Sequence, residues 1–111
     1  MYIKDRILSM TKSTSSDVVG YNFRAVNVGS WVGDEADYEN TPAAMATLDA
    51  FIDNGDDTIS IDLADSLVGL DGDFDVVVTA TDGLNESEAV VVSNVNFDFV
   101  APEPPTGVTI S

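Results

Sequence analysis

The residues of this chain whose types suit chemistry are aspartates in short turns that contain glycine. Hard cations such as Ca²⁺ bind several carboxylate and carbonyl oxygens at flexible geometry, so such turns could supply ligands. Neither the turn around Gly55 nor the turn around Gly72 has the alternating ligand positions of the twelve-residue calcium loop. Aspartate beside glycine is also the ordinary composition of tight turns. We therefore predict no dedicated cofactor and at most weak Ca²⁺ binding. The candidate metal ligands are Asp53, Asp56, Asp57, Asp71, Asp73 and Asp82.

Two residue types that dominate catalytic and metal sites are missing, because the chain has neither cysteine nor histidine. This excludes a disulfide framework, a thiolate metal site, a cysteine nucleophile and a histidine general base. Paired carboxylates could serve a glycosidase, but the 20 acidic residues of so small a chain form pairs by chance. We predict that the protein is not an enzyme.

The charge of the chain is strongly negative, since its 111 residues include 20 acidic and 4 basic side chains for a net charge of -16. All four basic residues fall in the first 24 positions, at Lys4, Arg6, Lys12 and Arg24. Phosphate binding depends on clustered lysine and arginine, so nucleic acid and anionic membranes are excluded as partners. The compatible partners are cations, basic surfaces of other structural proteins, or other copies of this chain.

Two aromatic residues, Trp31 and Tyr38, are candidate partner contacts in an irregular acidic stretch. Exposed aromatic side chains are enriched in interfaces, so this pair could stack on a sugar or contact a protein. The alternative is that the tryptophan folds back over the core of its own domain.

Alternating apolar residues predict the elements that position these side chains. Runs of period two cover residues 19–25, 58–63 and 74–80, which is typical of strands with one buried face. A longer run at 89–99 is apolar on both faces. Strict alternation there places Val91 on the face of Val95 and Phe97, with Val90 and Val92 on the opposite face.

Residues 42–52 favour a short helix or a coil insertion between two strands. Thr41 is a suitable N-cap, Pro42 suits the first helical position, and Gly55 could end the segment. Three apolar side chains in it have helical spacing, namely Met45, Leu48 and Ile52.

Residues 70–87 resemble the strand F region of bacterial immunoglobulin-like and fibronectin type III-like domains. The shared pattern is a leucine, a glycine and an aromatic that lead into alternating valines, followed by Ala-x-Asp and an Asn-x-Ser turn. Here it is carried by Leu70, Gly72, Phe74, Val76, Val78, Ala80, Asp82, Asn85 and Ser87. The resemblance implies an all-β antiparallel sandwich and no catalytic residues. It makes 6–10, 19–25, 58–63 and 89–99 the strands B, C, E and G. Residues 2–10 have a helical alternative, because Ile3, Ile7 and Met10 would share one helical face, and we favour the strand.

The sequence of residues 101–111 predicts a linker followed by a displaced strand. The proline-rich residues 101–105 form a stiff, extended linker, and 106–111 resemble the first strand of another domain of this kind. By the same resemblance the chain starts at strand B, so the domain lacks strand A at its N-terminal end. We expect residues 106–111 to form an additional strand at its C-terminal end. A sandwich edge with unpaired backbone groups recruits a strand from elsewhere.

Donation of this segment to a neighbouring subunit is easier than self-insertion, because the five linker residues reach at most roughly 17 Å. The candidate contact residues there are Pro104, Pro105, Val108 and Ile110. The alternatives are an ordinary flexible terminus and a linker to a further domain.

These patterns predict a sandwich domain at residues 1–100, with 101–111 as linker and C-terminal strand. The expected function is that of a non-enzymatic structural module. We expect a subunit of a virion surface, such as a phage head-decoration or tail component, or of a similar repetitive assembly, whose C-terminal segment contacts a neighbouring subunit. The alternative is a calcium-stabilised repeat of a bacterial surface adhesin. No signal peptide or membrane span is visible, which fits a virion-surface or extracellular module.

Overall fold

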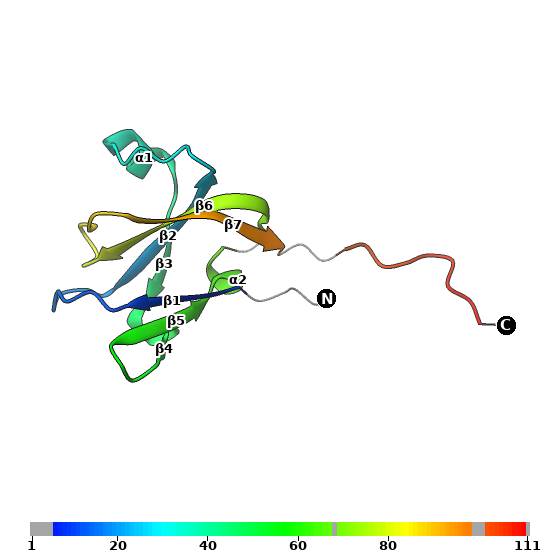
Figure 1. The fold of residues 1–111 in the computed structure, drawn as a ribbon, viewed down its shortest axis with the longest axis horizontal. Coiled ribbons are helices and arrows are strands. Elements are labelled where there is room, and N and C mark those ends of the chain that lie inside the picture. Colours follow the sequence, from blue (N-terminus) through cyan, green and yellow to red (C-terminus); the bar gives the residue numbers. More distant parts are fainter. Residues whose placement is uncertain (1–5, 68, 99–101, 111) are drawn as a thin grey trace.

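The computed structural model describes residues 6–67, 69–98 and 102–110, which form two antiparallel sheets and an extended C-terminal segment (Figure 1). The smaller sheet has the order β1–β5–β4, with β1 at Ile7–Thr11, β5 at Thr58–Asp62 and β4 at Ile52–Asp53. The larger sheet has the order β3–β2–β6–β7, with β3 at Ala44–Thr47, β2 at Gly20–Asn27, β6 at Asp71–Thr81 and β7 at Val90–Asp98. The helical segments are α1 at Glu35–Asn40, η1 at Leu48–Ala50 and α2 at Leu63–Ser66.

Apolar side chains from both sheets fill the space between them. Phe23 of β2, Val76 of β6 and Phe97 of β7 are buried from the larger sheet, and Ile59 and Ile61 of β5 meet them from the smaller one. These positions alternate along their strands with residues that face away, as expected when one face of each sheet is covered. The protein is therefore an all-β sandwich, as the sequence predicts.

The predicted strands at 19–25, 58–63, 74–80 and 89–99 are confirmed as β2, β5, β6 and β7, with residue 99 lying outside the described residues. The segment 6–10 is confirmed as a strand as well, because β1 pairs with β5 along its whole length. Alternating apolar residues predict β2, β5 and β6, a long apolar run predicts β7, and the family resemblance predicts β1.

The short helix or coil predicted near 42–52 is wrong for most of its length, because only η1 is helical there. Residues 44–47 form β3, which pairs with β2 and buries Ala46, and η1 and β4 follow. Met45 and Leu48 remain about half exposed, so the apolar residues at helical spacing do not form one buried face. Pairing with a neighbouring strand outweighs the intrinsic helix preference of the alanines, because tertiary contacts override propensity. The helix lies earlier, at α1, where the Asp34 side chain caps the Asp37 N–H.

The segment predicted as a C-terminal strand is extended and unpaired among the described residues. Residues 102–110 lie outside every strand and are exposed throughout. They lead away from the end of β7 into solvent (Figure 1).

Candidate partner-binding edge

The strand β1 forms one edge of the smaller sheet, and no described strand lies on its outer side. The Leu63 N–H donates to the Arg6 carbonyl at 2.8 Å, and the Lys12 N–H donates to the Asp57 carbonyl at 2.8 Å. Residues that exchange hydrogen bonds alternate along an antiparallel pair, so the even positions of β1 bond to β5. The backbone N–H and C=O groups that point toward the open edge are therefore those of Ile7, Ser9 and Thr11.

An apolar groove runs between this edge and β7. One stretch of it has a volume of about 370 Å³ and an adjoining stretch about 260 Å³. The two stretches are continuous, because Leu8 and Val92 line both. The apolar walls come from β1, β6 and β7, and consist of Leu8, Met10, Val78, Val90, Val92 and Val95.

The β7 wall of the groove depends on a β-bulge between Val92 and Val95. Val92 pairs with Val76, whereas Val95 pairs with Phe74, so β7 has one residue more than β6 in this interval. The extra residue shifts the alternation by one position. Val90 and Val92 therefore lie on the same face as Val95. The strict alternation predicted for residues 89–99, which places them on opposite faces, is wrong.

The Asp75 carboxylate holds the bulge in place. Its Oδ1 accepts the Asn94 N–H at 2.8 Å and its Oδ2 accepts the Gly29 N–H at 2.9 Å. Asn94 has a left-handed φ of 55°, a conformation that asparagine tolerates better than most residues. The two N–H donors hold the pKa of Asp75 below its usual value.

The predicted contact residues of the C-terminal segment lie together on its exposed length. Val108 is 74% and Ile110 is 99% exposed, and Pro104 and Pro105 are exposed too. Val108 and Ile110 are two positions apart, so in an extended chain their side chains point to the same side. This segment therefore offers an apolar stripe that nothing described in the chain covers.

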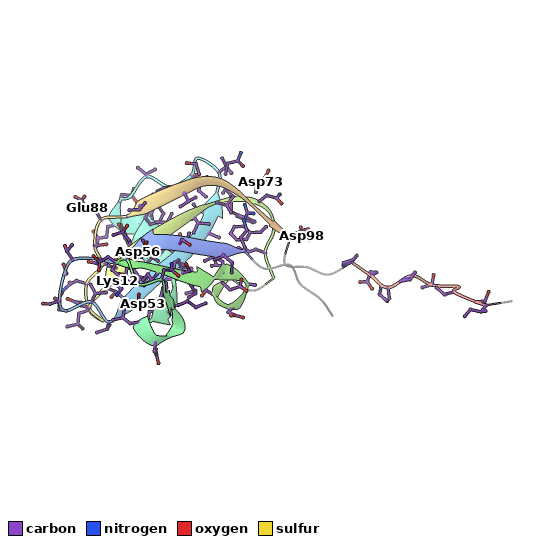
Figure 2. All side chains as sticks on the ribbon, turned by 60° about the horizontal axis from the view of Figure 1, so that its bottom comes forward. Lys12, Asp53, Asp56, Asp73, Glu88 and Asp98 are labelled. Atoms are coloured by element: carbon purple, nitrogen blue, oxygen red, sulfur yellow. The ribbon has the colours of Figure 1, made fainter. Side chains whose placement is uncertain are left out.

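The candidate metal ligands are not brought together. Among the described residues, no three acidic side chains lie close enough to hold a metal ion. Figure 2 shows Asp53 and Asp56 beside Lys12, whereas Asp73 lies near the end from which the C-terminal segment leaves.

Three of these aspartates, Asp53, Asp56 and Asp82, act as hydrogen-bond acceptors within their own turns. Asp53 accepts the Gly55 N–H at 2.8 Å and pairs with the Lys12 ammonium at 3.2 Å, and Asp82 accepts the Leu84 N–H at 2.9 Å. Such contacts hold the pKa of Asp53, Asp56 and Asp82 below the usual value. Asp73 accepts from the Asn96 amide, Asp71 begins β6, and Asp57 has a left-handed φ of 66°.

Trp31 and Tyr38 pack on each other over the outer face of the larger sheet. Their rings make an edge-to-face contact with centroids 5.0 Å apart, and the Arg24 guanidinium lies 5.3 Å from the Tyr38 ring centroid. Both aromatic side chains are partly exposed. The tryptophan thus folds back over its own domain, and part of the pair stays accessible.

An ion pair that no sequence pattern predicts lies beneath this aromatic pair. Arg24 is 4% exposed, and its guanidinium donates two hydrogen bonds to Glu86, at 2.6 and 3.0 Å. Glu86 Oε1 also accepts from Thr79 and Asn22. The Arg24 contact, with those two donors, lowers the pKa of Glu86 to about 2. Arg24 and Glu86 are 62 positions apart, so only the fold brings them together.

No helix among the described residues has the length and apolar character needed to cross a membrane. Comparison of the chain with protein family models, with curated proteins and with solved structures finds no match.

Proposed function

We propose that the protein is a non-enzymatic structural module that works by binding neighbouring subunits in a repetitive assembly, and that its C-terminal segment makes the contact. The observation that carries this proposal is the apolar stripe of Val108 and Ile110, exposed at the end of a stiff segment that leaves the body of the molecule. A virion surface is the setting we favour, and other extracellular arrays have the same requirement.

We further propose that the sandwich is of the immunoglobulin or fibronectin type III kind. Two features support this assignment. The sequence of β6 and the turn after it carries the pattern of strand F in those domains, and the three-stranded and four-stranded sheets have strand orders that fit strands B, E, D and C′, C, F, G. In this assignment β1 is strand B, and its open edge is the place of strand A.

The charge of the chain supports protein partners over nucleic acid. With a net charge of -16, the molecule repels phosphate and favours basic or uncharged protein surfaces. Residues 104–110 carry no charged side chain, so this segment can approach another acidic body at little electrostatic cost.

Sedimentation at increasing protein concentration tests this function. We expect the full chain to form species larger than a monomer, and the double variant Val108→Ser, Ile110→Ser to remain monomeric, because the apolar stripe is lost. The control is Thr106→Ser with Thr109→Ser, which leaves the stripe intact and should associate like the wild type. A wild-type chain that stays monomeric, or a double variant that associates equally well, would contradict the proposal.

A further inference from the structure

We infer that the groove between β1 and β7 accepts residues 106–110 of a second copy as an added antiparallel strand. This inference rests on the proposed function and names the acceptor for its C-terminal segment. It combines two features described above, an open backbone edge beside an apolar groove and an exposed apolar stripe on an extended segment.

The backbone of β1 is ready to pair with such a strand. The N–H and C=O groups of Ile7, Ser9 and Thr11 point to the open edge, because the even positions of β1 bond to β5. Strand addition at a sheet edge takes its affinity from main-chain hydrogen bonds and its specificity from pockets for alternate side chains. The groove supplies those pockets on the side that faces the core.

The side chains select one register. Leu8 and Met10 are the partly buried positions of β1 that line the groove. Cross-strand partners point to the same face, so Val108 opposite Met10 and Ile110 opposite Leu8 put the whole apolar stripe into the groove. This antiparallel register also places Thr109 opposite Ser9. A shift by one residue would turn the stripe out to solvent.

The direction of the chain favours a second copy over the molecule's own segment. Figure 1 shows β7 ending at the end of the molecule where β1 begins. A segment that folded directly back from there would run parallel to β1. An antiparallel entry would need the segment to pass along β1 and then reverse, and Pro102, Pro104 and Pro105 keep the linker extended.

The resulting contact is heterologous, because the C-terminal segment of one copy meets the groove of the next. Repeated contacts of this type close into rings or extend into filaments. Every copy then both donates and accepts a strand. Such contacts would build a repetitive assembly from one chain type through one interface.

A matched pair of substitutions in β7 tests the groove as the acceptor. Val92 is 38% and Val91 is 39% exposed, and the two are adjacent, but Val92 lines the groove while Val91 faces the other side of the sheet. Val92→Glu places a charge where the stripe would pack, whereas Val91→Glu adds the same charge outside the groove. We expect Val92→Glu to weaken self-association at least about tenfold and Val91→Glu to change it less than about twofold.

Circular dichroism and thermal melting of both variants show whether each is folded. Should Val92→Glu fail to fold, Val90→Glu replaces it, since Val90 is 66% exposed and lines the same groove. Equal association of the Val92 and Val91 variants would overturn the inference. If the Val108→Ser, Ile110→Ser variant still abolishes association in that case, the C-terminal segment acts at another acceptor and the proposed function stands. A monomeric wild type would overturn both.

Discussion

Arg24 carries a buried charge on the outer face of the larger sheet, and the stability of the fold depends on how that charge is paired. Its guanidinium lies against the Tyr38 ring and is neutralised by Glu86, which also accepts from Thr79. A buried charge that loses its partner is costly, because the remaining ion is neither solvated nor paired. Glu86 therefore stabilises the fold, and its depressed pKa reflects the same contacts.

We expect Glu86→Gln to lower the free energy of unfolding by about 1–3 kcal/mol at neutral pH, below the range for fully buried pairs because Glu86 is 22% exposed. The pKa of Glu86 is about 2 in the folded chain against 4.5 ordinarily, so the unfolded chain takes up the proton first as the pH falls. The difference between wild type and variant should be full above pH 4.5 and should disappear between pH 4.5 and about 2.

Urea unfolding at several pH values measures this difference. The Val108→Ser, Ile110→Ser background keeps association out of the measurement. Glu39→Gln is the control, because Glu39 is an exposed acid of α1 and should change stability by less than about 0.5 kcal/mol at any pH. A Glu86→Gln difference that does not depend on pH would contradict the role assigned to this carboxylate.

At the scale of single residues, the sequence predicts roles in local turns better than contacts between residues that are distant along the chain. The place of Asp53 and Asp82 near glycine predicts turn residues, and both accept N–H groups two positions ahead. The Arg24–Glu86 pair and the Asp75 bonds to Gly29 and Asn94 could not be predicted, because they join segments that are distant along the chain.

At the scale of elements, β3 packs unusually closely on the first residue of β2. A Cβ atom on Gly20 would lie 2.4 Å from the Ala46 carbonyl oxygen and 2.8 Å from the Met45 methyl carbon. The first of these is backbone, so β3 would have to move. Glycine at position 20 therefore permits the β2–β3 pairing that replaces the predicted helix.

We expect Gly20→Ala to destabilise the fold by about 1–3 kcal/mol, as overpacking in a close-packed region does. Thermal unfolding in the same monomeric background measures the change. Ser16→Ala is the control, because Ser16 is exposed in the loop before β2 and should leave the melting temperature nearly unchanged. A Gly20→Ala chain as stable as the wild type would show that β3 does not lie this close to β2.

Some elements can be predicted from their own sequence, and others depend on contacts with distant segments. β2, β5 and β6 carry apolar side chains at alternate positions, and that pattern predicts them as strands. β3 has a sequence that also suits a helix, and only its pairing with β2 determines its conformation. The bulge in β7 contains no glycine to mark it, so the orientation of Val90 and Val92 could not be read from strict alternation.

At the scale of the whole molecule, the C-terminal segment is complementary to the groove in length and in apolar spacing. The open edge of β1 and the long apolar run of β7 are both left uncovered by the described residues, and residues 106–110 have the length and the apolar spacing to cover them. The sequence predicts an unpaired segment and an open edge. It does not predict the groove, whose walls depend on the bulge and on the packing of the two sheets.

The exchange of backbone amide hydrogens along β1 tests most directly whether the C-terminal segment of a second copy adds to this edge. In the concentrated full chain we expect slow exchange at Ser9 and Thr11, because the added strand places Thr109 and Gly107 opposite them and accepts their N–H groups. In the Val108→Ser, Ile110→Ser variant these two amides should exchange fast, while Leu8 and Met10 stay slow in both proteins because they bond to β5. Equal exchange at Ser9 and Thr11 in the two proteins, whether fast or slow, would contradict the proposed strand addition.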